Sequence, residues 1–325
     1  MERNVSLKKR ILRIVIGGLL VGVLGLALLL GGSVYALKLP TWGHLPVVKG
    51  VRADPNRLQE HVTYLSQETY GRHAGNLEVL NQAADYVEQA LKQPNSRVTR
   101  QPYHADGRDY GNLIARFGPD EGTLWVVGAH YDAHQNLPGA DDNASGVAGL
   151  LELARMLGQV EVKHPLVLVA YSTEEAPYYG THSMGSYVHA ASLVKSKTPL
   201  SGMICLEMIG YYCEQQRYPY PHLTWLYPKE GNFIAVIGRW QDRSLIRHVK
   251  RGFNGATDLP VQSVTLAIEN SDHMNYWKHG YPAVMITDTA WARNRNYHKD
   301  TDTADTLNYD KMAGVIDGVF CAVMN

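Results

Sequence analysis

The sequence predicts an α/β fold in which a mixed, mostly parallel sheet lies between layers of helices, preceded by one N-terminal transmembrane helix. Three observations support this. The 325 residues are 45% hydrophobic and 19% charged, as in ordinary globular proteins. Short apolar runs alternate with helical patterns, which favours helices packed on both faces of a sheet. The first 36 residues differ in composition from the rest. No linker tract or fixed-period repeat divides the remainder, so one large domain is expected.

The N-terminal segment has the composition of a membrane anchor. Residues 1–13 contain five basic residues and one acidic residue, and an apolar stretch then runs from Ile14 to about Leu30. A bilayer span needs about 20 apolar residues, whereas the apolar part of a cleaved signal has about 7 to 15. We therefore predict a cytoplasmic basic segment at 1–13, a transmembrane signal anchor at 14–36 and an exported domain at 37–325.

A signal peptide cleaved near residues 34–36 is the alternative interpretation, and it also exports the domain.

Charge and cysteine content narrow the classes of function. The chain outside residues 1–13 carries 26 basic and 30 acidic residues, a net charge of −4, so nucleic acid is not an expected partner. Three cysteines are too few for a disulfide scaffold, and a large hydrophobic core must stabilise the domain. A bridge between Cys205 and Cys213 and two small buried thiols are both open interpretations.

Two surface helices are expected first in the exported domain. Residues 55–71 and 76–92 place apolar side chains three and four positions apart, with Asp54 as an N-cap and Pro55 at the first helical position. Strands and helices then alternate. Strands are expected at 112–117, 123–130, 165–172, 203–210, 233–238 and 282–289, and helices at 145–157 and 186–194.

Three of these strands, 123–130, 165–172 and 282–289, are apolar at consecutive positions rather than at alternate ones. A strand that is covered on both faces requires this pattern.

Possible metal ligands follow the predicted strands. In open α/β sheets the carboxyl ends of the strands form the ligand-binding edge. The side chains placed there are His130, Asp132, Glu174, Glu175, Glu207, Tyr297 and His298. Imidazole and carboxylate ligands together suit zinc or a similar ion, and the absence of cysteine among them excludes a structural zinc finger.

The loop before the helix at 145–157 adds a further carboxylate. Asp141 and Asp142 precede Asn143 and Ser145, either of which could cap that helix. Two aspartates are therefore more than capping requires, and one of them could bridge two metal ions.

At this point the sequence resembles the M28-type co-catalytic zinc exopeptidases, which include bacterial leucyl aminopeptidases. The motifs that carry the resemblance are "GAHYDA", "GADDNASG", "STEE", "CLEMIG", "SDHMNYW" and "RNRNYHKDTDT", which occur in the family's order over about residues 110–310. The resemblance implies that 37–325 is a zinc peptidase domain that acts on peptides.

The resemblance also implies a ligand set for two zinc ions. One ion is held by His130, Asp142 and Glu207, and the other by Asp142, Glu175 and His298, with Asp142 as the bridge. The family commonly has Asp where this chain has Glu207. Asp132 matches a carboxylate that orients the imidazole of a metal ligand.

Two further residues are assigned to catalysis. Glu174 is the expected general base, because Glu175 is committed to metal and neighbouring side chains of an extended segment point in different directions. Tyr297 resembles the family's phenolic group that stabilises the oxyanion.

Three other functions remain open at this stage. A glutaminyl cyclase-like acyltransferase would use a single zinc. A carboxypeptidase could grip a substrate carboxylate with Arg293 and Arg295. A non-catalytic ectodomain would have lost ligands, whereas here every ligand position holds a competent residue.

Two weaker sets receive no catalytic role. Ser271, Asp272 and His273 could cap a helix or lie in a pocket. Aromatic residues near the motifs could line a substrate pocket or belong to the core. They are Tyr178, Tyr179, Tyr211, Tyr212 and Trp291.

Overall fold

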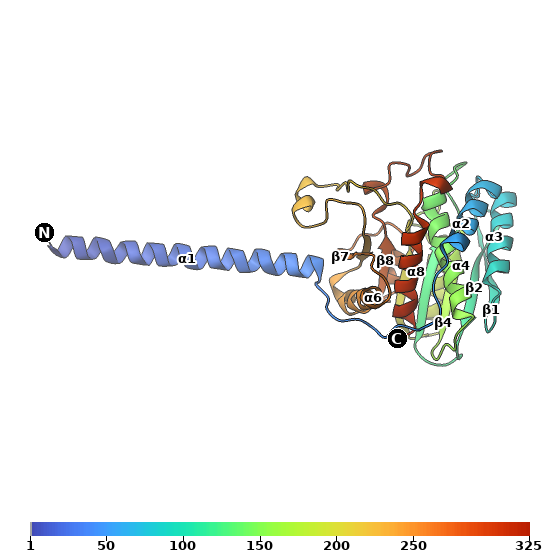
Figure 1. Ribbon diagram of the computed structural model, residues 1–325, viewed down its shortest axis with the longest axis horizontal. Coiled ribbons are helices and arrows are strands. Elements are labelled where there is room, and N and C mark those ends of the chain that lie inside the picture. The colour runs from blue at the N-terminus through green and yellow to red at the C-terminus, as the bar shows by residue number, and fades with distance from the viewer. Residues whose placement is uncertain (1) are drawn as a thin grey trace.

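A computed structural model describes residues 2–325, and the side chains of residues 1–12, 14 and 15 lie outside that description. The chain forms one long N-terminal helix and a domain built around one sheet (Figure 1). The mixed α/β architecture predicted from the sequence is confirmed.

The sheet has eight strands in the order β1-β2-β4-β3-β5-β8-β6-β7. Strands β3, β4, β5 and β8 form a parallel block. The pairs β1–β2, β2–β4 and β6–β8 are antiparallel, and β6 and β7 are parallel to each other. The strands are β1 (Arg97–Ala105), β2 (Arg108–Phe117), β3 (Leu124–His130), β4 (Leu166–Tyr171), β5 (Leu200–Leu206), β6 (Ile234–Ile237), β7 (Val261–Val264) and β8 (Ala283–Thr287).

Helices cover both faces of the sheet. Helices α2, α4, α6 and α8 share one apolar cluster with the sheet, and α5 and α7 share the other. Successive residues of a buried strand serve opposite clusters: Leu168 of β4 packs in the first and Val169 in the second. The helices are α2 (Pro55–Thr63), α3 (Leu77–Leu91), α4 (Gly146–Leu157), α5 (Gly185–Lys195), α6 (Arg243–Ala256), α7 (His273–Lys278) and α8 (Tyr309–Val323).

Most of the expected elements lie where the patterns place them. The helix expected at 55–71 is α2, and a π-helical turn continues it to Glu68. The edge strands β1 and β7 and the helices α6 and α8 were not predicted. The side chains of β1 are exposed or half-buried except at Ala105, so this strand lacks the apolar run of a buried strand.

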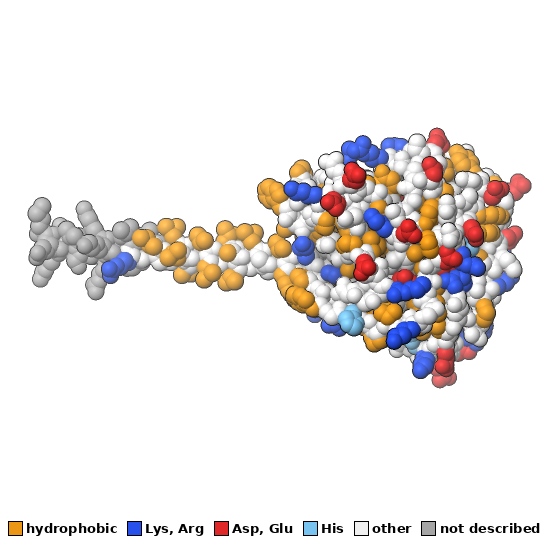
Figure 2. Space-filling view, in the orientation of Figure 1, with side chains coloured by type: hydrophobic (Ala, Val, Ile, Leu, Met, Phe, Trp, Pro, Cys, Tyr) orange, Lys and Arg blue, Asp and Glu red, His pale blue; other side chains and the backbone are white. Residues whose placement is uncertain are grey.

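The N-terminal helix α1 spans Glu2–Lys38. Its residues Ile16–Lys38 are apolar and long enough to cross a membrane, and none is buried by the domain, as the exposed apolar side chains in Figure 2 show. The same properties would suit a signal sequence. The basic side chains of Lys8, Lys9 and Arg10 lie outside the described residues, so the cytoplasmic segment 1–13 stays a prediction.

Candidate metal centre

The carboxyl ends of the parallel strands carry the predicted side chains to one edge of the sheet. His130 is the last residue of β3, Glu174 and Glu175 follow β4, and Glu207 follows β5 directly. His298 lies in the segment after β8. Parallel neighbours end at the same edge, and this topology explains why residues distant in sequence meet here.

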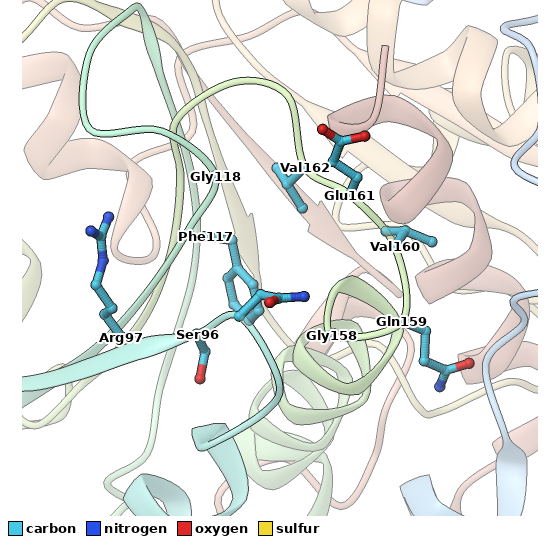
Figure 3. Close-up of a pocket in the computed structure, with 10 residues that line it drawn as sticks. Ser96, Arg97, Phe117, Gly118, Gly158, Gln159, Val160, Glu161 and Val162 are labelled. Atoms are coloured by element: carbon cyan, nitrogen blue, oxygen red, sulfur yellow. The ribbon is translucent and has the colours of Figure 1, made fainter.

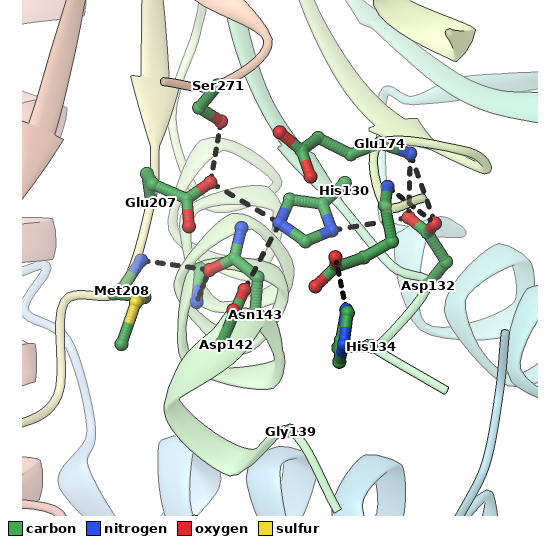
Figure 4. Close-up of polar contacts among 12 residues, drawn as sticks. His130, Asp132, His134, Gly139, Asp142, Asn143, Glu174, Glu207, Met208 and Ser271 are labelled. Atoms are coloured by element: carbon green, nitrogen blue, oxygen red, sulfur yellow. Dashed lines mark hydrogen bonds and ion pairs between the residues drawn. The ribbon is translucent and has the colours of Figure 1, made fainter. Parts of the chain in front are cut away.

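The first cluster contains His130, Asp142 and Glu207, all buried (Figure 4). The Nε2 atom of His130 lies 3.3 Å from Oε2 of Glu207 and 3.5 Å from Oδ1 of Asp142.

The second cluster shares Asp142. The Nε2 atom of His298 lies 3.0 Å from Oδ2 of Asp142 and 3.3 Å from Oε1 of Glu175. The two oxygens of the Asp142 carboxylate thus face two different histidines. A carboxylate placed in this way can contact two cations at once.

These residues fit divalent metal ions. Zinc lies about 2.0 to 2.1 Å from nitrogen and oxygen ligands, so tetrahedral ligands are about 3.3 Å apart, close to the distances within both clusters. Among the described residues, the buried Nε2 of His130 finds no hydrogen-bond partner. Four buried carboxylates converge on two histidines, and burying such charge without a cation is costly. Zinc is therefore a chemically suitable occupant.

The pKa values of residues in and beside the two clusters are shifted by burial and by their neighbours. Burial lowers the pKa of His298, but hydrogen bonds to Asp142 and Glu175 outweigh it and raise the pKa to about 10. Burial also raises the pKa of the Glu174 carboxyl well above its usual value, and the neighbouring Glu175 and Glu207 charges add to this. Both shifts reflect the crowding of carboxylates around the two histidines, where a bound cation would offset the repulsion between the negative charges.

Asp132 links the two sides of the centre. Its Oδ1 lies 3.2 Å from Nδ1 of His130, on the side of the ring away from the cluster. The same carboxylate accepts hydrogen bonds from the backbone N–H groups of Glu174 and Glu175 at 3.0 to 3.1 Å. Asp132 therefore has the contacts required to orient both the imidazole and the turn after β4.

The loop that carries Asp142 is held by its backbone. Asp302 accepts hydrogen bonds from the N–H groups of Asp141 at 3.0 Å and Asp142 at 3.1 Å. Asn143 caps the start of α4 by accepting from the N–H of Gly146, whereas the hydroxyl of Ser145 donates to the carbonyl of Asp141. Of the two expected caps, Asn143 is the one that accepts a helix N–H.

The two residues assigned to catalysis lie beside the clusters. Glu174 is only 6% exposed, and Figure 4 shows its carboxylate directed toward the space between Ser271 and His130. Tyr297 is half-buried, and its ring stacks on that of His298 with centroids 3.8 Å apart.

Three residues contact the candidate ligands without having been assigned a role from the sequence. His134 donates from Nδ1 to Oε2 of Glu175 at 3.1 Å, and its ring stacks on that of His298 with centroids 3.8 Å apart. Ser271 donates to Oε2 of Glu207 at 2.6 Å. Asp302 is the third. All three lie within motifs already quoted or directly beside them, and that proximity was the available signal.

Because Tyr297 and His134 both lie nearly parallel to the His298 ring at 3.8 Å, they must cover its opposite faces. The two rings thereby hold the imidazole of His298 between them, with its Nε2 atom directed toward Asp142.

Two further motif residues, His273 and Asp272, lie in the interior. His273 is fully buried, bonds to the carbonyl of Ile268 and meets Trp277 edge to face. Asp272 is also fully buried, and burial raises its pKa to about 7.

The arginine expected to grip a carboxylate is not free to do so. Arg293 is 2% exposed and donates to Oε1 of Gln216 at 2.6 Å and to two backbone carbonyls, those of Tyr211 and Phe233. The interpretation of Arg293 as a substrate-binding residue is wrong, because its guanidinium is committed to the side chain of Gln216 and to these two backbone carbonyls. Arg295 is exposed.

Of the aromatic residues near the motifs, Tyr178 is buried with its hydroxyl 3.2 Å from that of Tyr110, whereas Tyr179 and Trp291 are 44% and 53% exposed. Tyr211 and Tyr212 are half-buried.

Cys205 and Cys213 are both free thiols, so the disulfide interpretation is not supported.

A cavity of about 650 Å³ lies at the opposite edge of the sheet (Figure 3). It sits where β2 ends and the chain approaches β4, and it contains none of the predicted site residues. Its lining is formed by Asn95, Ser96, Arg97, Phe117, Gly118 and residues 158–162. Arg97 is paired with Asp120, so the cavity offers no unpaired charge from that residue.

Comparisons with known proteins bear on the family and the fold of the chain. The model of peptidase family M28 matches residues 112–323. A protein of Escherichia coli K12 named YfbL, described as uncharacterized, is 48% identical over 289 residues, which cover 84% of this chain and 88% of that protein. Leucine aminopeptidase 1 of Coccidioides posadasii is 27% identical over 215 residues. The matched region covers 62% of this chain and about half (52%) of that protein.

Solved structures share the fold. LapB of Legionella pneumophila superposes with a TM-score of 0.67 at 21% identity, over 87% of this chain and 77% of that chain. A glutaminyl cyclase of Fimbriiglobus ruber gives a TM-score of 0.62 at 19% identity, over 88% of this chain and 98% of that chain.

Proposed function

Because this chain belongs to peptidase family M28, we propose that it is a di-zinc aminopeptidase that removes N-terminal residues from peptides. The observation that carries the proposal is the Asp142 carboxylate, whose two oxygens face His130 and His298 separately. A carboxylate in this position can bind two adjacent metal ions at once. The aminopeptidase named among the relatives supports the choice of reaction.

The chain's own residues would hold the metal ions, orient the ligands and transfer the proton. His130, Asp142 and Glu207 would hold one ion, and Glu175 and His298 with the shared Asp142 would hold the other. When bound, two zinc ions polarise the scissile carbonyl and lower the pKa of a water molecule.

Glu174 has the position of a general base. It takes a proton from the attacking water and passes it to the leaving amine, as its buried carboxylate beside His130 allows. The hydroxyl of Tyr297 donates to the developing oxyanion. Asp132 keeps the imidazole of His130 in the orientation that presents Nε2 to the cluster.

We further propose that α1 is retained as a single-pass membrane anchor and that the peptidase domain, residues 37–325, lies outside the cytoplasm. The apolar stretch Ile16–Lys38, none of which is buried by the domain, supports this, together with the basic residues that precede it.

The experiment is a substrate screen on the purified full chain in detergent. Aminoacyl and N-blocked substrates are compared before and after chelation and after zinc is restored. Hydrolysis of free aminoacyl substrates that is lost with chelator and recovered with zinc is expected. Hydrolysis of N-blocked peptides from the carboxyl end would contradict the aminopeptidase assignment.

A single-zinc cyclase reaction is distinguished by its product. Mass spectrometry of a peptide that begins with glutamine would show loss of ammonia for cyclisation, whereas hydrolysis releases free glutamine. We expect release of free glutamine or no reaction.

A further inference from the structure

Helix α1 joins the domain without a flexible linker. Leu39, the first residue after α1, is completely buried. The N–H of Thr265 donates to the carbonyl of Leu37 at 3.0 Å, and Nζ of Lys250 donates to the carbonyl of Leu39 at 3.1 Å. Ser263 of the edge strand β7 bonds to Lys38. The end of α1 is thus fixed to β7 and α6, and its direction decides which face of the domain meets a membrane.

Exposed apolar side chains surround this junction. We name Trp42, Tyr220, Trp225 and Leu266 the collar; their exposed fractions are 73%, 62%, 85% and 52%. Leu266 follows Thr265, which bonds to α1. Trp42 lies four residues after Lys38, within about 14 Å along the chain.

The loop that carries Tyr220 and Trp225 is tied to the same junction. Tyr227, two residues after Trp225, donates to the carbonyl of Ser263 at 3.0 Å, and Nζ of Lys38 lies 5.5 Å from the centre of its ring. The short helix Pro221–Trp225 buries none of its side chains. In Figure 1 this loop extends from the domain on the side where α1 joins it and lies level with the last turns of α1.

Tryptophan and tyrosine are the residues that prefer the interface between lipid and water, because each has an apolar body and a polar group. An exposed apolar patch next to a membrane helix therefore has an evident partner.

A basic stripe completes this face. Arg243, Arg247 and Arg251 lie four residues apart and so share one side of α6. Arg247 donates to the hydroxyl of Tyr35 in α1 at 3.3 Å, and Arg251 donates to the carbonyl of Trp42 at 3.4 Å. Helix α6 contains no acidic residue. The stripe is suited to anionic phosphate groups.

We propose that the collar and the basic stripe form a surface that rests on an anionic phospholipid bilayer, with Trp42 and Trp225 at the level of the headgroups. This proposal rests on α1 being a membrane anchor. Since α1 runs across the strands in Figure 1, the carboxyl edge of the sheet then opens along the bilayer surface and not away from it.

Tryptophan fluorescence can test this surface in the full chain, because α1 contains no tryptophan. The protein is reconstituted into nanodiscs that contain anionic phospholipids brominated near the carbonyl end of their acyl chains, and quenching is compared among variants. Trp225→Phe and Trp42→Phe should each lose part of the quenching. Trp291→Phe, at a residue 53% exposed on the metal-centre side, is the matched control and should lose none.

Charge is tested separately. Replacing Arg243, Arg247 and Arg251 together by Gln should reduce quenching in anionic discs to the level seen in zwitterionic discs. The matched control replaces Arg97, Arg100 and Arg116 by Gln, the same charge change on the opposite edge of the sheet.

Failure of the anchor and failure of the surface give different results. Protein that is washed from vesicles at alkaline pH would show that α1 does not span the bilayer. Protein that stays in the bilayer while Trp225→Phe and Trp42→Phe leave quenching unchanged would overturn the proposed surface and leave the anchor intact.

Discussion

Among single residues, the neighbouring Glu174 and Glu175 differ most clearly in what their carboxylates contact. Glu175 faces His298 and His134 through its two oxygens, whereas the carboxylate of Glu174 points toward His130 from the other side. Adjacent acidic residues therefore have different contacts, and their substitution should give different defects.

Glu174→Gln removes the proposed base while keeping the size of the side chain. General-base catalysis typically contributes 10²- to 10⁴-fold, so we expect kcat to fall within about that range while metal content is unchanged. Steady-state kinetics and elemental analysis of the same preparation measure both. Undiminished kcat would show that another group takes the proton.

His134 has contacts that predict a positioning role. It bonds to Glu175 and covers one face of His298. His134→Phe keeps a stacked ring and loses the hydrogen bond, so zinc affinity at the Glu175 and His298 position should fall by about 10- to 100-fold. Competition with a fluorescent chelator measures the affinity. The exposed His182, changed to Phe, is the control, and equal affinities in the two variants would argue against this role.

At the scale of elements, the loop 139–145 is the part that sets the geometry of the bridge. Its conformation depends on Asp302, which accepts two consecutive backbone N–H groups. Nothing in the loop's own sequence identifies that partner.

Asp302→Asn leaves a side chain that can accept only through its single amide oxygen. Because Asp142 serves both clusters, we expect both zinc affinities to fall together, unlike the selective effect of His134→Phe. Isothermal titration with zinc separates the two cases. Loss of one site alone would mean that the loop does not position the shared carboxylate.

The parallel strands could be predicted because buried strands have continuous apolar runs. The meeting of the candidate ligands could be predicted because imidazole and carboxylate side chains stand at the ends of these strands. Edge strand β1 could not be predicted with the same criterion, because it lacks a buried apolar run. Helices α6 and α8 were missed, although the buried residues Leu245, Val249 and Phe253 of α6 have helical spacing. The support of Arg293 by Gln216 depends on a contact 77 residues away in sequence, which no local pattern reveals. His134 was missed because its position directly after a motif is a weak signal, and its contacts with Glu175 and His298 depend on residues distant in sequence.

At the scale of the whole molecule, the buried Lys250 connects α1, α6 and β7. Its ammonium group bonds to the carbonyl of Leu39 and to Oγ of Ser263. Burial, helped by the charges of Lys38 and Arg247, lowers the pKa of Lys250 from 10.5 to about 8.

This shift has a defined consequence for stability. Between pH 8 and 10.5 the unfolded chain keeps the proton that the folded protein has released, so raising the pH favours the folded state at this residue. The melting temperature of the wild type relative to Lys250→Met should therefore rise across that interval. Thermal unfolding in detergent micelles checks this, with the exposed Lys195→Met as control. A difference that stays constant with pH would show that the pKa of Lys250 is not lowered.

The number of tightly bound zinc ions decides whether Asp142 joins two metal positions. Zinc titration of the metal-free full chain should show two sites per chain, His298→Ala should leave one, and Asp142→Asn should weaken both. A single tight site in the wild type, unaffected by His298→Ala, would contradict the account and favour single-zinc chemistry.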